Sequence, residues 1–281
     1  MEALLSRAAQ LEQGPDAARP LAGKVVANLF FEDSTRTRSS FEIAAKRLGA
    51  EVLNWTTRGS SVSKGETLLD TVRNIDAMGP HAIVMRHASS GSAAFAAQYT
   101  RATVVNAGDG THEHPSQALL DAFTLRRALG NLEEKRILIV GDILHSRVAR
   151  SNLRCLRLLG ARVAFCGPPT LLPREMADAG AELSFDLDKA LEGADAVMML
   201  RVQLERQKDA AFPSAREYSR MWGLTQSRAD RLPPSVVVLH PGPMNRGVEI
   251  ATQVADGPRS LILEQVRHGV AVRMAILEAC A

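Results

Sequence analysis

Two arginines lie where a helix is predicted to begin, in the segment Ser34-Thr35-Arg36-Thr37-Arg38. An apolar run at residues 25–30 predicts a strand before this segment, and an apolar stripe from Phe41 onward predicts the helix. The first turn of a helix disfavours cations, because its free N–H groups carry partial positive charge. Together, those N–H groups, the hydroxyls and the arginines favour a bound anion such as phosphate. The alternative is an ordinary N-cap by Asp33 or Ser34 with a solvated first turn.

Five further polar segments follow predicted strands or begin predicted helices. They are the Gly/Ser-rich loop around Ser61 and Lys64, the segment His114-Pro115-Ser116-Gln117, the helix start at Arg147, the strand end at Arg201 and Gln203, and the loop His240-Pro241-Gly242-Pro243. In open parallel sheets ligands lie off the carboxyl ends of strands, so these segments are candidate ligand contacts. Arg147, again in a first turn, indicates an anionic ligand rather than a cap. Each segment also has a structural alternative, namely a solvated loop, a surface histidine, a surface arginine or a simple turn.

Neither a metal nor a nicotinamide cofactor is supported by the motifs. Residues 109–115 contain His, Asp and Glu, but two histidines two residues apart across a proline-started turn do not have a zinc spacing. Gly141 follows a predicted strand where a dinucleotide-binding fold has its Gly-rich turn, yet the pattern G-x-G-x-x-G is absent. We therefore expect no cofactor and no metal.

Short β-branched runs alternate with amphipathic segments, which predicts an α/β protein with two domains, each a mainly parallel sheet flanked by helices. Strands are predicted at residues 25–30, 51–55, 82–86, 103–106, 136–140, 162–166, 194–200 and 236–239. The polar segment 130–135 begins with a helix-stopping glycine and predicts a boundary between domains 1–130 and 131–260. A closing helix is predicted near residues 260–279. Residues 204–231 are charged and weakly periodic, which predicts a long loop with one short helix.

Composition limits the function classes. The 281 residues carry a formal net charge of only +3, from 34 basic and 31 acidic residues, which does not favour nucleic-acid binding. The three cysteines form no CxxC pair, so no disulfide framework is expected. The chain shows no signal-peptide pattern and no apolar run of membrane-spanning length, and we expect a cytoplasmic protein without membrane contact.

Seven segments in this order together resemble the aspartate/ornithine carbamoyltransferase family: FFEDSTRTRSSFE, SSVSKGETLLDT, MRH, HPSQALLD, HSRVARS, LRVQ and HPGPMNRG. The resemblance covers nearly the whole chain and is to the aspartate-specific branch. It implies an active site in the cleft between the two domains, with carbamoyl phosphate bound by residues 1–130 and L-aspartate by residues 131–260. It also implies that a closing helix, 261–281, crosses back to the first domain. The product would be N-carbamoyl-L-aspartate, an early intermediate of de novo pyrimidine biosynthesis.

The resemblance further implies an assembly. Catalytic chains of this family form homotrimers with active sites shared between subunits, so Ser61 (or its neighbour Ser60) and Lys64 would reach the neighbour's site. A regulatory chain or a dihydroorotase is an additional partner by family analogy, and the sequence does not choose between them. The first predicted helix, near Leu4, is short against the family pattern, which leaves its packing on the closing helix open.

The family's residue roles transfer by position. The phosphate ligands would be Ser34, Thr35, Arg36 and Thr37, together with Arg86. The groups that polarise the carbamoyl carbonyl would be Thr37, Arg86 and His114. The carbamoyl amino group would be held by Gln117 and the loop that contains Gly242 and Pro243. The two carboxylates of aspartate would be bound by Arg147, Arg201, Gln203 and the neighbour's Lys64. The predicted catalytic residues are thus Arg36, Thr37, Arg86 and His114, and no covalent nucleophile is needed because positioning and charge stabilisation suffice.

Two alternatives within this family remain. An ornithine carbamoyltransferase would be expected to show His-Cys-Leu-Pro where this chain has His240-Pro241-Gly242-Pro243, would not need Lys64, and would have its cationic substrate repelled by Arg201. A non-catalytic assembly homologue would not need to keep a competent residue at every matched position.

Overall fold

The computed structural model describes residues 1–14, 19–56, 65–202 and 214–280. Internal contacts divide the chain into two units, which we call unit 1 (Met1–Leu120 with Val266–Ala281) and unit 2 (Asp121–Gln265). The chain passes between the units within two helices, α5 (Pro115–Leu129) and α12 (Ile262–Cys280). The polar segment 130–135 directly follows α5.

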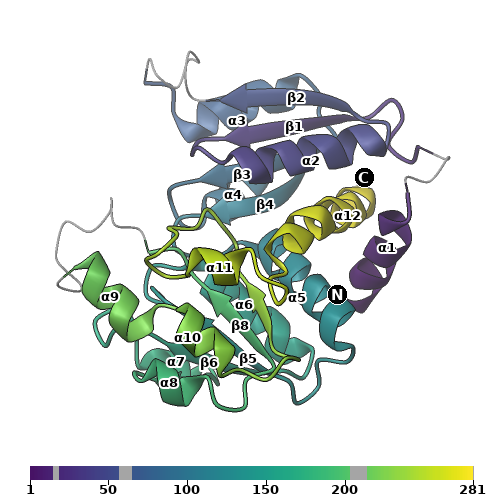
Figure 1. Ribbon diagram of the computed structural model, residues 1–281. Helices are drawn as coiled ribbons and strands as arrows, with labels where there is room; N and C mark the ends of the chain where they lie inside the picture. The colour runs from purple at the N-terminus through teal and green to yellow at the C-terminus, as the bar shows by residue number, and fades with distance from the viewer. Residues whose placement is uncertain (15–18, 57–64, 203–213, 281) are drawn as a thin grey trace. The chain divides into compact units, whose positions relative to one another are not determined.

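Unit 1 contains a four-stranded sheet in which all pairs are parallel, with the order β2-β1-β3-β4 (Figure 1). The strands are β1 (Val25–Phe30), β2 (Glu51–Thr56), β3 (Ala82–His87) and β4 (Thr103–Asp109), and the helices that precede α5 are α1 (Glu2–Glu12), α2 (Thr35–Arg47), α3 (Leu68–Ala77) and α4 (Ser92–Ala97). Alternate residues of β1 and β3, such as Leu29 and Ile83, form a buried cluster with Ile75 of α3. The α2 helix packs against β1 and β2. The predicted strands of this half are confirmed, with ends one to three residues later in β2, β3 and β4.

Unit 2 contains a five-stranded, fully parallel sheet with the order β7-β6-β5-β8-β9. The strands are β5 (Arg136–Val140), β6 (Arg162–Cys166), β7 (Glu182–Ser184), β8 (Ala196–Met199) and β9 (Val237–Leu239). The helices of this unit, besides its parts of α5 and α12, are α6 (Arg147–Leu158), α7 (Glu175–Asp178), α8 (Leu187–Ala190), α9 (Ala215–Trp222), α10 (Gln226–Asp230) and α11 (Thr252–Ala255). The prediction omitted β7, because three residues are too few to show a hydrophobic period.

The prediction of one short helix in 204–231 was wrong, because this stretch contains both α9 and α10. Each is short, and each is capped by a hydroxyl: Ser214 accepts from the N–H of Glu217, and Thr225 from that of Arg228. Residues 203–213 lie outside the described part.

The N-terminal helix α1 packs beside α12 within unit 1 (Figure 1). The guanidinium of Arg7 donates to both carboxylate oxygens of Glu278, at 2.7 and 2.8 Å. The imidazole Nε2 of His268 lies 3.1 Å from the carboxylate of Glu12. A short first helix is therefore sufficient for contact with the closing helix. None of the helices in the described ranges combines the length and apolar character needed to cross a bilayer.

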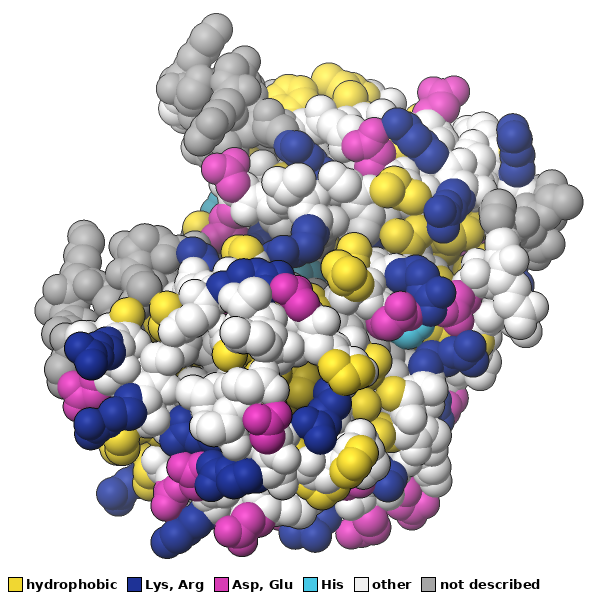
Figure 2. All heavy atoms as spheres, in the orientation of Figure 1, with side chains coloured by type: hydrophobic (Ala, Val, Ile, Leu, Met, Phe, Trp, Pro, Cys, Tyr) yellow, Lys and Arg dark blue, Asp and Glu magenta, His cyan; other side chains and the backbone are white. Residues whose placement is uncertain are grey.

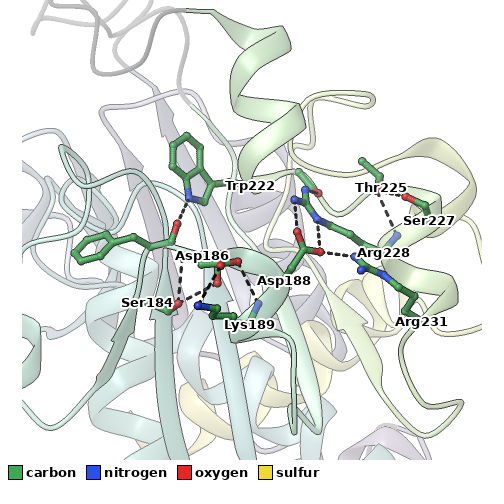
Figure 3. A network of polar contacts seen from close by, with 11 residues as sticks. Ser184, Asp186, Asp188, Lys189, Trp222, Thr225, Ser227, Arg228 and Arg231 are labelled. Atoms are coloured by element: carbon green, nitrogen blue, oxygen red, sulfur yellow. Dashed lines mark hydrogen bonds and ion pairs between the residues drawn. The ribbon is translucent and has the colours of Figure 1, made fainter.

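A polar network joins α8 to α10 in unit 2 (Figure 3). Arg228 donates from Nε and Nη2 to the two carboxylate oxygens of Asp188, at 3.1 and 2.9 Å, and Arg231 donates to the same carboxylate. A cavity of about 260 Å³ lies beside this network and is lined in part by Leu191 and Leu232. No predicted site residue lines this cavity, and its arginines already bind a carboxylate, so we assign the network a structural role.

Charge on the visible face of the molecule is mixed. Figure 2 shows Lys and Arg side chains interspersed with Asp and Glu, in keeping with the small formal net charge of +3. The cations predicted to bind ligands are therefore local features of the segments that follow the strands described next.

Candidate active site

The predicted site residues of unit 1 leave its sheet at one edge. Phe30 at the end of β1 pairs with Arg86 of β3, and His87 of β3 pairs with Asp109 of β4. The backbone N–H of Phe31 donates to the carbonyl of Arg86 at 2.9 Å. Because the strands are parallel, the segments that follow β1, β3 and β4 all emerge at this edge, where open α/β sheets bind ligands.

The start of α2 differs from other helix starts in this protein. Ser34 is the N-cap residue, but its side chain accepts no hydrogen bond from the first turn. By contrast, the hydroxyl and carboxylate N-caps described elsewhere, at α3, α6, α8, α9 and α10, all accept one. The first turn of α2 has no acidic residue, and Arg36 in it is exposed. This helix start thus combines an unused cap, a cation and N–H groups, as an anion site requires.

Thr37 lies on the inner side of the same turn. Its side chain is buried, whereas Thr35 is exposed, and its carbonyl accepts from the hydroxyl of Ser40 at 3.0 Å. The two threonines therefore occupy different environments although both belong to one helical turn.

Arg86 is held from both neighbouring strands. Its Nε lies 3.3 Å from the carboxylate of Glu32, just after β1, and one Nη donates to the carbonyl of Ala107 in β4 at 3.4 Å. Both members of the ion pair are largely buried. This arrangement fixes the guanidinium at the sheet edge, because a buried charge is tolerated only when it is paired.

Asp109 organises the turn that leads to His114. Its carboxylate accepts from the backbone N–H of Gly91 and Glu113 and lies 3.0 Å from His112 Nδ1. Burial acts to raise the pKa of this carboxyl, but the hydrogen bonds, led by that from the Asn106 amide, keep its pKa below the ordinary value. A charged Asp109 therefore braces this turn against β4.

His114 directly precedes α5 and Gln117 lies in its first turn, and both residues are buried. The carbonyl of His114 accepts from the N–H of Gln117 at 3.0 Å, and its imidazole Nδ1 lies 3.5 Å from the Ser116 hydroxyl. The two predicted ligands therefore lie within one helical turn, as the proline-started helix indicated.

The predicted residues of unit 2 follow three adjacent strands. Val140 at the end of β5 pairs with Met199 of β8, and β9 lies on the other side of β8. Arg147 begins α6 after β5, Arg201 comes two residues after β8, and both are half-buried. The expectation that α6 begins without a cap was wrong, since Ser146 accepts the N–H of Ala149 at 3.1 Å. Arg147 therefore stays a predicted ligand on its position alone.

The loop after β9 has a buried internal support. The N–H of Gly242 donates to Nδ1 of His240 at 2.8 Å, and the peptide bond to Pro243 is cis. His240 Nε2 lies 3.2 Å from Glu249 Oε1, and both side chains are fully buried. Because Nδ1 accepts a hydrogen bond, the ring proton lies on Nε2 and is donated to the carboxylate. Gly242 φ is +65°, a conformation that favours glycine.

Three predicted site residues, Ser61, Lys64 and Gln203, lie outside the described residues. The others lie at two sheet edges, one in each unit: Ser34, Thr35, Arg36, Thr37, Arg86, His114 and Gln117 in unit 1, and Arg147, Arg201, Gly242 and Pro243 in unit 2. Within the described ranges no group of three or more His, Cys, Asp or Glu is arranged to hold a metal. The described arginines, hydroxyls and N–H groups at these edges can donate hydrogen bonds to anions and stabilise negative charge.

Sequence reasoning missed the residues that hold the predicted ligands in place. Glu32, Asp109, Asn245 and Glu249 were given no supporting role, although each lies within or beside a motif. Only for Glu32 did the sequence offer an indication, because this carboxylate lies shortly before a helix start that contains arginines. The contacts of Glu32 with Arg86 and of Asn245 with Val202 join residues more than forty positions apart, so no local spacing could reveal them. The carboxylates of Asp109 and Glu249 also bond to residues three to nine positions away.

Family models match both parts of the chain. The model of the aspartate/ornithine carbamoyltransferase carbamoyl-phosphate-binding domain matches residues 1–127, and that of the aspartate/ornithine-binding domain matches residues 133–280. A relative from Myxococcus xanthus, the aspartate carbamoyltransferase catalytic subunit, is 66% identical over 281 residues, which is all of this chain and 95% of the relative. The corresponding subunit from Anaeromyxobacter sp. strain K is 60% identical over 92% of this chain and 82% of its own.

Solved structures give the same fold. Aspartate transcarbamoylase from Trypanosoma cruzi, in complex with carbamoyl phosphate and aspartate, superimposes with a TM-score of 0.87 at 32% identity, covering 98% of this chain and 91% of the other. Ornithine carbamoyltransferase from Thermus thermophilus superimposes with a TM-score of 0.88 at 27% identity, covering 99% and 93%. The chain therefore belongs to the aspartate/ornithine carbamoyltransferase family.

Proposed function

We propose that this protein transfers the carbamoyl group of carbamoyl phosphate to the amine of L-aspartate, which forms N-carbamoyl-L-aspartate and phosphate. The observation that carries the proposal is the start of α2, where an N-cap serine leaves its cap unused and an exposed arginine occupies a first turn without acidic residues. The names of the relatives above, which share up to 66% of their residues with this chain, support aspartate as the acceptor. The reaction belongs to pyrimidine biosynthesis.

Unit 1 would bind carbamoyl phosphate. Ser34, Thr35 and Arg36 would hold the phosphate through N–H groups, hydroxyls and a guanidinium, all of which favour a dianion. The buried Thr37 would instead face the carbamoyl carbonyl, together with Arg86 and His114. Gln117 would hold the carbamoyl amino group with the loop of Gly242 and Pro243.

Unit 2 would bind L-aspartate. Arg147 and Arg201, with Gln203 and a neighbour's Lys64, would bind its two carboxylates. Arginine is suited to this task because its planar fork matches a carboxylate with two parallel hydrogen bonds. A substrate with a cationic side chain would instead be repelled.

The proposed reaction needs no covalent intermediate on the protein. The aspartate amine attacks the carbamoyl carbon, an N–C bond forms, and the carbonyl oxygen takes up negative charge. Collapse of this tetrahedral species breaks the C–O bond to phosphate, which leaves with the electron pair and takes up the proton that the former amine nitrogen loses. Donors aimed at the developing oxyanion stabilise it, and loss of one such donor costs about 3–4 kcal/mol in the barrier.

We also propose that the working assembly is a homotrimer with Ser61 and Lys64 contributed across subunits, acting in the cytoplasm. Three free cysteines, two of them buried, fit a reducing compartment. A regulatory chain or a dihydroorotase would be an added partner of this trimer.

A phosphate-release assay tests the function. With carbamoyl phosphate present, the purified protein should release phosphate in proportion to added L-aspartate and not to added L-ornithine. The product should be identified as N-carbamoyl-L-aspartate by mass. Phosphate release with L-ornithine but not with L-aspartate would indicate an ornithine carbamoyltransferase. No phosphate release with either acceptor, by folded and trimeric protein, would favour a non-catalytic homologue.

A further inference from the structure

The side chain of Asn245 connects the loop after β9 to the segment after β8. Its amide Nδ2 donates to the backbone carbonyl of Val202 at 2.8 Å. Its own backbone N–H donates to Oε1 of Glu249, the same oxygen that accepts from His240. Glu249 is fully buried, so Asn245 is fixed on one side by a carboxylate that cannot turn to solvent. Asn245 therefore links the backbone of this loop to the backbone of Val202.

Val202 is the residue after Arg201, and the backbone is held in place on both sides of Arg201. The side chain of Val202 is fully buried in a small cluster with Leu171 and Tyr218. On the other side of Arg201, the N–H of Leu200 donates to the carbonyl of Val140 at 2.8 Å, which continues the β5–β8 ladder. The backbone of Arg201 is thus held before it by the sheet and after it by Asn245.

We propose that Asn245 is a positioning residue for aspartate binding, because it fixes the backbone from which Arg201 extends. The inference rests on the proposed function, in which Arg201 binds a carboxylate of aspartate. A fork of two parallel hydrogen bonds requires a fixed guanidinium, and a misplacement of about 1 Å can cost on the order of 10²-fold in rate. Asn245 would accordingly act on aspartate binding without touching the substrate.

The test compares Asn245→Ala and Asn245→Asp with the unchanged protein in steady-state kinetics for both substrates. The carboxylate of Asn245→Asp keeps the size of the side chain but cannot donate to the Val202 carbonyl. Each variant should raise KM for aspartate about tenfold, the order expected for one lost hydrogen bond. KM for carbamoyl phosphate should change less than about twofold by the same reasoning.

The neighbouring residue provides a matched control. Arg246 follows Asn245 in the same loop, is exposed, and donates to the two carboxylate oxygens of Asp256 at 2.7 and 2.8 Å. Arg246→Ala should leave both KM values unchanged. Thermal unfolding of every variant shows that the comparison is made on folded protein, and Asn245→Asp replaces Asn245→Ala if the latter unfolds.

A double variant separates positioning from general loosening of the loop. In an Arg201→Ala background, adding Asn245→Ala should raise KM for aspartate no further, because the group that Asn245 positions is gone. The proposal would be overturned if the effects of Arg201→Ala and Asn245→Ala on KM for aspartate were additive, or if Asn245→Ala changed both KM values equally. It would also be overturned if Arg246→Ala raised KM for aspartate as much as Asn245→Ala does. Activity of the unchanged protein is measured first, so that failure of the proposed function is seen independently.

Discussion

Arg36 and Arg201 have chemically identical side chains and both follow a strand, yet their surroundings differ. Arg36 is exposed in the first turn of a helix that has no acidic residue there. Arg201 is half-buried, two residues beyond β8, on a backbone fixed from both sides. A helix N-terminus favours an anion such as phosphate, whereas Arg201 is not at the start of any described helix, so we propose different substrates for the two arginines.

Replacing Arg201 tests this division at a single residue. Arg201→Ala should raise KM for aspartate by roughly 10- to 150-fold, the range for lost hydrogen bonds to a charged group, because no other change compensates for the guanidinium. KM for carbamoyl phosphate should change by no more than about threefold. Arg220→Ala, an exposed arginine of α9, serves as the control. Equal losses for both substrates would remove the assignment of Arg201 to aspartate.

At the scale of elements, an ion pair between Asp188 and Arg228 joins the short helices α8 and α10. Helices of four and five residues have little stability of their own. Hydrogen bonds from Arg228, aided by Arg231, lower the pKa of the Asp188 carboxyl from 3.8 to about 2 (Figure 3). The folded state therefore binds a proton at Asp188 less readily than the unfolded state does.

This lowered pKa predicts an acid dependence of stability. The contribution of Asp188 is fully present above about pH 4 and is lost as the pH falls toward 2, because only the unfolded state gains the proton readily. Its size should be about 1 kcal/mol, since the carboxylate is 44% exposed and solvent screens the pair. Urea unfolding between pH 5 and pH 2.5 should show a smaller fall in the free energy of unfolding for Asp188→Asn than for the parent. Asp178→Asn, an exposed carboxylate of α7, should behave as the parent does.

The fold of the whole molecule does not distinguish the two specificities of this family. Structures of an aspartate enzyme and of an ornithine enzyme superimpose on this chain with TM-scores of 0.87 and 0.88. In our proposal the acceptor is therefore selected by side chains at the strand ends of unit 2 and by Lys64 of a neighbouring subunit, so that the proposed assembly would contribute to the specificity.

Subunit mixing tests whether sites are shared. Arg36→Ala and Lys64→Ala should each be inactive alone, and after dissociation and reassembly of an equal mixture roughly a quarter of the sites should contain both intact residues. Phosphate release should recover to about that fraction. Arg36→Ala mixed with Arg86→Ala is the control, because both residues belong to the same subunit's site and no intact site can form. Absence of recovery in the first mixture would argue against shared sites.

Local sequence patterns were sufficient to predict most of the strands and helices. The mainly apolar stretches of β1, β5 and β6 predicted their bounds to the residue, because strands covered on both faces are apolar at most positions and do not alternate. β7 escaped, since three residues carry too little periodicity, and the pair α9 and α10 was taken for one helix. At the site, the sequence indicated the cations and hydroxyls themselves, which are recognisable by type and by position after a strand.

What the sequence determined by itself was therefore most of the strands, the helix starts at the candidate site and the family to which the chain belongs. What only the tertiary structure decided was how the side chains at those positions are held. Glu32 meets Arg86 because β1 pairs with β3, and Asn245 meets Val202 because the loops that follow the neighbouring strands β8 and β9 approach each other. These contacts join residues more than forty positions apart. Hydrophobic periodicity can be recognised within one short segment, whereas strand register depends on two segments that are distant in the sequence.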